Sequence, residues 1–303
     1  MKFLTFAQGS GTALGVVTHS GDILDLTALM RQESGALPAP GDVADLIALG
    51  NAGLDTVRAL LADGARHAPH LLPAAGVKVL APIARPGKNI FCVGRNYKAH
   101  IVEGNLASGR DPNDFPKAME VFSKPWTTVV GTGDPVHRHA KHTRVMDYEI
   151  ELAIVIGKGG VDIPRASALD HVFGYTIIND VTARDLQKRH GQWFKGKSLD
   201  SYCPMGPWVV HRSAVPDAQA LEMELQVNGE TRQKASTSDM LFDVPAIIEQ
   251  LSAGLTLHPG DVIATGTPSG VGYAMNPMRC LEVGDVMRLR IAGLGELVNT
   301  VVE

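Results

Sequence analysis

The sequence has few cysteines and no paired cysteine motif, which excludes several classes of protein. Its 303 residues include only Cys92, Cys203 and Cys280. These three are widely spaced and odd in number, so we expect no disulfide framework, zinc ribbon or redox couple. A reduced, cytoplasmic environment is the expected location.

The chain also lacks a basic excess and a long apolar run. Lys and Arg total 28 against 32 for Asp and Glu, so the positive field that binding to a phosphate backbone requires is missing, and we expect no nucleic-acid partner. No apolar stretch approaches the length of a membrane span, and the N-terminal MKFLTFAQGSG becomes polar too early for a signal-peptide core. We expect no membrane partner.

Two domains are expected from the pattern along the chain. Residues 1–30 alternate short apolar runs with turn residues, and residues 42–62 have helical apolar spacing, which predicts a small N-terminal α/β domain over 1–75. Prolines at 69, 73, 82 and 86 then mark a boundary, and a second domain is predicted over 85–303.

The second domain is expected to be rich in strands. The predicted strands cover 146–158, 174–180, 224–233 with a turn at Asn228-Gly229, 261–266, and a final pair within 285–303. Predicted helices over 98–104, 181–190 and 243–253 are too few and too irregular for a doubly wound fold. The predicted class is therefore α+β, with a β-rich, mixed core.

Three carboxylates follow one face of the predicted strand over 146–158. Its even positions from 148 to 156 are all apolar, whereas its odd positions begin with Asp147, Glu149 and Glu151. Residues two apart on a strand lie roughly 7 Å apart on the same side. A divalent cation would relieve their repulsion, and oxygen ligands favour magnesium, manganese or calcium. The alternative is a solvated edge strand whose Glu residues face water or pair with Lys and Arg.

A further carboxylate, Asp180, stands where a predicted strand gives way to a predicted helix. Alone, Asp180 is equally consistent with a helix N-cap, but together with Glu149 and Glu151 it favours a metal site. Arg184 and Gln187 are three apart on the same predicted helix and could face that site. A structural salt bridge is the alternative for Arg184.

Histidines occur in two informative places. His100 and Glu103 are three apart, so one helical turn would let the carboxylate orient the imidazole as a general base, although an exposed pair has the same spacing. The group His137, His139 and His142 matches no known ligand spacing and follows a Gly- and Pro-rich stretch, so we expect an exposed loop there.

The segment 191–198, GQWFKGKS, matches the phosphate-loop pattern, but its surroundings do not. Charged residues precede it where a buried strand is required, and bulky Trp193 and Phe194 occupy the loop. We expect no nucleotide binding, and Lys197 remains as a candidate cation. The segment 265–272, TGTPSGVG, could instead form an anion-binding nest.

Six segments, in this order, resemble the fumarylacetoacetate hydrolase family over residues 85–303. They are GRNYKAHIVEG, FSKPWTTVVGTGDPV, DYEIELAIVIGKGG, NDVTARDLQ, GKSLDSYCPMGPWVV and PGDVIATGTPSGVG. The resemblance implies the family's β-roll around a metal site, and a homodimer. CVGRNYKA lacks the extra Asp ligand of the founding enzyme, which favours the acylpyruvase-like branch, and residues 104–120 could form a lid.

The resemblance also implies roles for individual residues. Mg²⁺ or Mn²⁺, with Ca²⁺ as an alternative in vitro, would be bound by Glu149, Glu151 and Asp180. The implied catalytic residues are the His100–Glu103 dyad and Lys197, which contacts the developing negative charge. The implied substrate contacts are Arg95, Arg184, Gln187, Lys197 and Thr267.

The function expected from this resemblance is hydrolytic cleavage of a C–C bond. The substrate would be a 2,4-dioxo acid, either an acylpyruvate or a 2,4-dioxo-3-deoxy sugar acid, and the products would be pyruvate and a carboxylic acid. Oxaloacetate tautomerisation or decarboxylation and 2-hydroxy-dienedioate isomerisation are alternatives on the same scaffold. A catalytically silent protein that binds a metal or a ligand is an alternative from a different class.

Overall fold

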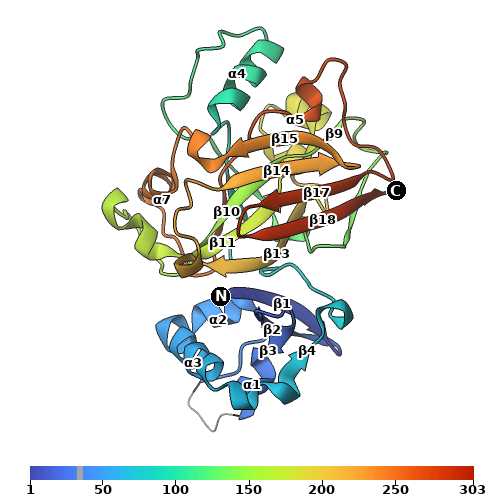
Figure 1. Ribbon diagram of the computed structural model, residues 1–303. Coiled ribbons are helices and arrows are strands. Elements are labelled where there is room, and N and C mark those ends of the chain that lie inside the picture. The colour runs from blue at the N-terminus through green and yellow to red at the C-terminus, as the bar shows by residue number, and fades with distance from the viewer. Residues whose placement is uncertain (33–36) are drawn as a thin grey trace.

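The computed structural model describes residues 1–32 and 37–303, and within these ranges the strands form three sheets (Figure 1). The N-terminal lobe contains β1 (Lys2–Gln8), β2 (Gly11–Val17), β3 (Ile23–Asp25), β4 (Leu71–Leu72), α1 (Leu26–Gln32), α2 (Val43–Ala48) and α3 (Gly50–Ala62). The single helix predicted over 42–62 is therefore two helices. Gly50 has a φ of 60°, a left-handed conformation that interrupts the helix between them.

The largest sheet continues from this lobe into the rest of the chain. Its further strands are β5 (Ile90–Val93), β6 (Val121–Lys124), β7 (Val129–Val130), β10 (Ile150–Ile156), β11 (Val172–Asn179), β13 (Cys203–His211) and β16 (Val262–Ala264). The junction is the pairing of β1 with β13, where Lys2 lies opposite Val210 and Phe3 opposite Val209. The N-terminal lobe and the rest of the chain thus share one sheet, and the domain boundary predicted between residues 75 and 85 stays a prediction.

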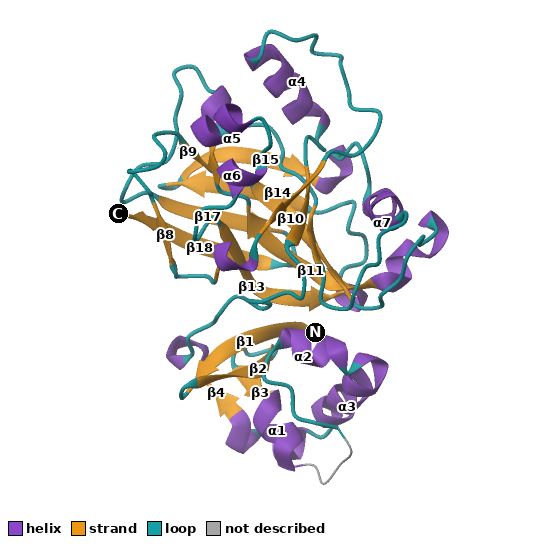
Figure 2. Ribbon diagram, turned by 180° about the vertical axis from the view of Figure 1, so that it is seen from behind, coloured by secondary structure: helices purple, strands orange, loops and turns teal. Residues whose placement is uncertain are grey.

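A second sheet packs against the first in the C-terminal part (Figures 1 and 2). It consists of β15 (Glu230–Ser236), β14 (Glu222–Val227), β17 (Val286–Ile291), β18 (Gly295–Val302) and β8 (Pro135–His137), in that order. Asn228 and Gly229 have φ values of 53° and 81° and connect β14 to β15, so the predicted hairpin turn is confirmed. The predicted final pair of strands corresponds to β17 and β18.

The α-helices of the C-terminal part lie outside the two sheets (Figures 1 and 2). They are α4 (Lys98–Ala107), α5 (Arg184–His190), α6 (Phe194–Lys197) and α7 (Val244–Ser252). A two-strand pair of β9 (Met146–Asp147) with β12 (Thr182–Ala183) lies beside α5. No helix in the described ranges is both long and apolar enough to cross a lipid bilayer.

The strand β10 is central and buried on both faces. Its neighbours are β11 and β16, and Ile150, Leu152, Ile154 and Ile156 belong to the core between the two sheets, as the apolar face predicted. Ala153 and Val155, which alternate with them, pack in the core on the opposite face. The strand is therefore not a solvated edge strand, although Glu149 does pair with an arginine and a lysine, as that alternative allowed. The predicted strand over 146–158 is also interrupted, since β9 ends at Asp147 and β10 begins at Ile150.

The close approach of β11 to β13 provides a test of this architecture. A Cβ on Gly174 would lie 2.2 Å from the carbonyl oxygen of Val210, so Gly174→Ala forces the two strands apart. We expect the free energy of unfolding, measured by urea denaturation, to fall by about 1–3 kcal/mol. Gly87→Ala, where a Cβ meets nothing within 4 Å, is the matched control. Equal stability of the two variants would contradict the tight packing.

Candidate active site

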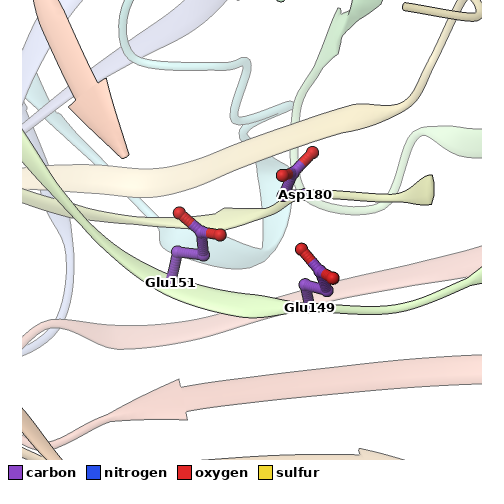
Figure 3. Close-up of side chains that lie close together, drawn as sticks. All are labelled: Glu149, Glu151 and Asp180. Atoms are coloured by element: carbon purple, nitrogen blue, oxygen red, sulfur yellow. The ribbon is translucent and has the colours of Figure 1, made fainter. Parts of the chain in front are cut away.

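Three buried carboxylates converge at the end of the large sheet. Glu149 precedes β10, Glu151 lies on it, and Asp180 follows β11. The antiparallel register places Ile150 opposite Asn179, and the Asp180 amide donates to the Glu149 carbonyl at 2.9 Å. Each carboxylate offers an oxygen within 4.8 Å of the others, and Figure 3 shows the three groups pointing toward one another. The three residues are at most 4% exposed.

Cations from three other elements neutralise two of these carboxylates. Lys197 Nζ lies 2.7 Å from Glu149 Oε2 and 2.6 Å from Asp180 Oδ2. Lys124 Nζ lies 2.5 Å from Asp180 Oδ1, and Arg184 Nη2 lies 2.7 Å from Glu149 Oε1. The buried carboxylates need these cations, because an unpaired charge in the protein interior costs several kcal/mol of folding free energy.

Glu151 differs, because no cation of the described chain lies within ion-pair distance of it. The contact to its side chain is the amide of Gly266, 2.8 Å from Oε2. Burial, followed by the charges of Asp180 and Glu149, raises the pKa of the Glu151 carboxyl well above its ordinary value. Burial has the same effect on Glu149, but Lys197 and Arg184 outweigh it and lower the pKa of that carboxyl.

This donor set fits a divalent metal ion. It offers hard carboxylate oxygens from three residues, and one of the three carboxylates lacks a cation to stabilise its charge. The residues that the structure describes contain no second group of three such donors with this geometry. The three histidines of the 137–142 segment belong to no such group. His137 bonds to the Glu303 carbonyl and His139 to the Asp200 carbonyl.

Long-range contacts show what Asp180 and Asp147 bind. Asp180 is not an N-cap, because α5 begins at Arg184 after Ala183, and both Asp180 oxygens face lysines. Asp147 lies apart from the other three carboxylates. Its oxygens accept from the amides of Gly272 and Tyr273 and pair with Arg184 at 2.9 Å.

Lys197 is held in place by the packing of α6 on α5. A Cβ on Gly196 would lie 2.5 Å from the backbone nitrogen of Gln187, so only glycine permits this contact. In the segment 191–198, which matches the phosphate-loop pattern, the second glycine therefore serves the packing of α6 on α5, and a helix rather than a strand precedes the segment. Burial favours a neutral Lys197, but the charges of Asp180 and Glu149 raise the pKa of Lys197 above its ordinary value. Its side chain is therefore an ammonium ion at neutral pH.

His100 and Glu103 on α4 form the predicted pair. His100 Nδ1 lies 3.0 Å from Glu103 Oε2, and the other Glu103 oxygen accepts from the Gly270 amide at 3.0 Å. The two side chains are 14% and 21% exposed, so the pair is not freely solvated. Within the described ranges His100 Nε2 has no hydrogen-bond partner, which leaves it available for proton transfer.

His100 and the three carboxylates line one cavity of about 570 Å³. The predicted substrate contacts Arg95, Arg184, Gln187, Lys197 and Thr267 also line it. Besides Arg184 and Lys197, whose ion pairs are described above, Thr267 and Arg95 are also engaged. Thr267 Oγ1 donates to the Ile150 carbonyl and accepts from Gln233, and Arg95 forms a two-pronged pair with Glu120. Gln187 Oε1 accepts from Arg184 at 3.3 Å.

The sequence-based reasoning did not identify Lys124. This residue is fully buried at the end of β6 and donates to both Asp180 and the Val181 carbonyl. A lysine two residues after the apolar pair Val121-Phe122 was the available signal, because a cation within a buried segment needs an acid as its partner.

Comparisons with known proteins agree with this geometry. The model of the fumarylacetoacetate (FAA) hydrolase C-terminal family matches residues 89–302. Oxaloacetate tautomerase YisK of Bacillus subtilis is 44% identical over 99% of this chain and 100% of its own length. The mitochondrial oxaloacetate tautomerase fahd2 of Xenopus laevis is 38% identical over 93% of this chain and 83% of its own length.

A solved structure extends the comparison to the metal. The maleylpyruvate hydrolase of Sphingobium sp. SYK-6, in complex with manganese(II) and pyruvate, has a TM-score of 0.77 and 33% identity, covering 100% of this chain and 99% of that one. Both the family match and these full-length similarities include the three carboxylates and the dyad. The chain belongs to the fumarylacetoacetate hydrolase family of enzymes.

Proposed function

We propose that the enzyme interconverts the keto and enol forms of a small 2-oxo acid, with oxaloacetate as substrate. The observation that carries the proposal is that His100, which is hydrogen-bonded to Glu103, lines the same cavity as the three carboxylates. An acid–base group beside a centre of positive charge is what enolisation requires. The 44% identity to an oxaloacetate tautomerase over the full chain supports the choice of substrate.

Glu149, Glu151 and Asp180 would bind Mg²⁺ or Mn²⁺, which when bound supplies Lewis acidity to the 2-oxo group. Lys197 adds a fixed ammonium charge next to Glu149 and Asp180, where negative charge develops on the substrate.

The dyad moves the proton. His100 Nε2 accepts a proton from C3 of the keto acid and returns it to the enol oxygen, so the reaction consumes no co-reactant. Glu103 accepts a hydrogen bond from Nδ1 and stabilises the imidazolium form during the transfer. The Gly270 amide holds the Glu103 carboxylate in that orientation.

Hydrolysis of a C–C bond in a 2,4-dioxo acid is the second candidate. It is supported by the likeness to the maleylpyruvate hydrolase with bound manganese and pyruvate. In that reaction His100 would take a proton from water, and the resulting hydroxide would attack the distal carbonyl. The bond to C3 then breaks, and the pyruvate enolate that leaves takes up a proton.

The two candidates and the silent alternative are distinguished by product analysis. We expect the Mn²⁺-loaded protein to accelerate the decay of the enol absorbance of oxaloacetate, and EDTA to abolish this effect. Acetylpyruvate is offered separately, with pyruvate release followed by a coupled dehydrogenase assay. Release of pyruvate from acetylpyruvate without any effect on the oxaloacetate enol would favour the hydrolase. Metal binding without either activity would favour the silent protein.

Replacing the histidine of the dyad tests its role. We expect His100→Ala to lower kcat for the preferred substrate by about 10²–10⁴-fold, because the general base is lost. Glu103→Gln should have a smaller effect in the same direction. His142→Ala, a change to an exposed histidine outside the cavity, is the control. Near-normal turnover of His100→Ala would refute the assignment.

Replacing Glu151 separates metal binding from folding. Without metal, Glu151→Gln should melt at the same temperature as the wild type or higher, because a neutral amide replaces a carboxyl whose ionisation is opposed by burial. Mn²⁺ should raise the melting temperature of the wild type but not that of Glu151→Gln. The exposed Glu222→Gln is the control and should respond to Mn²⁺ like the wild type. An undiminished response of Glu151→Gln would exclude this residue as a ligand.

A further inference from the structure

A glutamine occupies the core-facing position of a strand at the edge of the second sheet. Gln233 is the one buried residue of β15, at 1% exposed, and lies opposite Leu225 of β14, which belongs to the core. An apolar side chain would be the simplest occupant of such a position. A buried side-chain amide is tolerated only when its polar groups have partners, so the contacts of Gln233 show what it holds together.

The amide of Gln233 makes three hydrogen bonds, all to backbone or side-chain groups around the active site. Oε1 accepts from the Ile150 amide at 3.0 Å, and Nε2 donates to Thr267 Oγ1 at 2.8 Å and to the Pro268 carbonyl at 2.7 Å. A backbone N–H only donates and a carbonyl only accepts, so these partners fix which way the amide points. Thr267 Oγ1 in turn donates to the Ile150 carbonyl at 2.9 Å, which closes a ring of hydrogen bonds.

Ile150 is the residue between two of the three proposed metal ligands, Glu149 and Glu151. The ladder that joins β10 to its neighbour β16 ends at Ala153, so Ile150 lies beyond it. At this point of β10 the Gln233 side chain binds the backbone amide that faces away from the ladder with β11. Gln233 thus holds the strand where it presents the two glutamates.

The loop after β16 contacts two acids of the site. Its amides at Gly266 and Gly270 donate to Glu151 at 2.8 Å and to Glu103 at 3.0 Å. The two loop groups that Gln233 binds lie between these amides in the sequence. Gln233 does not line the cavity, so it reaches the two acids only through the loop and β10.

Other contacts keep the end of this loop in place. A Cβ on Gly270 would lie 2.1 Å from the Arg232 carbonyl oxygen, and the Tyr148 hydroxyl donates to the Gly270 carbonyl at 3.1 Å. We therefore expect the loss of the Gln233 amide to displace the middle of the loop without unfolding it.

We propose that Gln233 is a positioning residue, which sets the places of Glu151 and Glu103 relative to each other by joining the loop to β10. It acts from outside the cavity. The inference rests on the proposed function of the dyad and deepens it, because it adds a residue on which both metal binding and proton transfer depend. Groups that orient metal ligands without touching the ion typically contribute about 10- to 100-fold to metal affinity or activity.

The first test measures metal affinity. Gln233→Met removes all three hydrogen bonds and keeps the length of the side chain. We expect it to weaken Mn²⁺ binding by about 10- to 100-fold, because the loop no longer fixes Glu151. The dissociation constant is measured by calorimetry, so turnover is not needed. The control is Gln226→Met on β14, whose partly exposed side chain bonds to Glu224 outside the cavity and whose loss should leave Mn²⁺ binding as in the wild type.

The second test separates positioning from a general loss of structure. At saturating Mn²⁺ we expect Gln233→Met to lower kcat by about 10- to 100-fold, since a displacement of about 1 Å can cost this much. In a Glu103→Gln background the same change should lower kcat by less than about threefold, because the group that Gln233 positions is already lost. Equal losses of kcat in the two backgrounds would overturn the inference.

Thr267→Val is the variant to use if Gln233→Met does not fold. It keeps the shape of the side chain and removes the hydroxyl that joins Gln233 to the Ile150 carbonyl. We expect Mn²⁺ binding to weaken by about two- to tenfold, as for the loss of one hydrogen bond. Unchanged Mn²⁺ affinity in the variants that fold would overturn the inference. Weaker Mn²⁺ binding by Gln233→Met in a protein that acts on neither oxaloacetate nor acetylpyruvate would support the role of Gln233 at Glu151 and reject the proposed function.

Discussion

The excess of negative charge at the buried end of the large sheet is the constraint on which the rest of the structure depends. Glu149, Glu151 and Asp180 lie within 4.8 Å of one another in a core that is otherwise apolar. Like charges at this distance are tolerated only with cations beside them. The chain supplies them from β6, α5 and α6, and these elements thereby enclose the cavity.

One loop connects the metal site to the acid–base pair. The Gly266 amide donates to Glu151, and four residues later the Gly270 amide donates to Glu103. The loop begins at the end of β16, which lies directly beside β10 in the sheet. The position of α4 is therefore tied to the carboxylates through this short loop, which relates the place of His100 to that of the three carboxylates.

The two reactions proposed for this site share an enolate and differ in what happens to it. In both proposals, the metal that the three carboxylates would bind and the ammonium group of Lys197 would stabilise the enolate charge, so the same electrostatic environment would serve tautomerisation and C–C cleavage. The outcome would then depend on the group from which His100 takes a proton.

The sequence by itself determined the local features. The alternation along β10, the hairpin at Asn228-Gly229 and the i, i+3 spacing of His100 and Glu103 follow from the periods of strands and helices, which are properties of neighbouring residues. Tertiary structure alone decided that Asp180 is a partner of Lys124 rather than an N-cap, and that Arg95 is engaged by Glu120. These pairs join residues 56 and 25 positions apart. No local period encodes such contacts, because they form only when the sheet and the helices pack together.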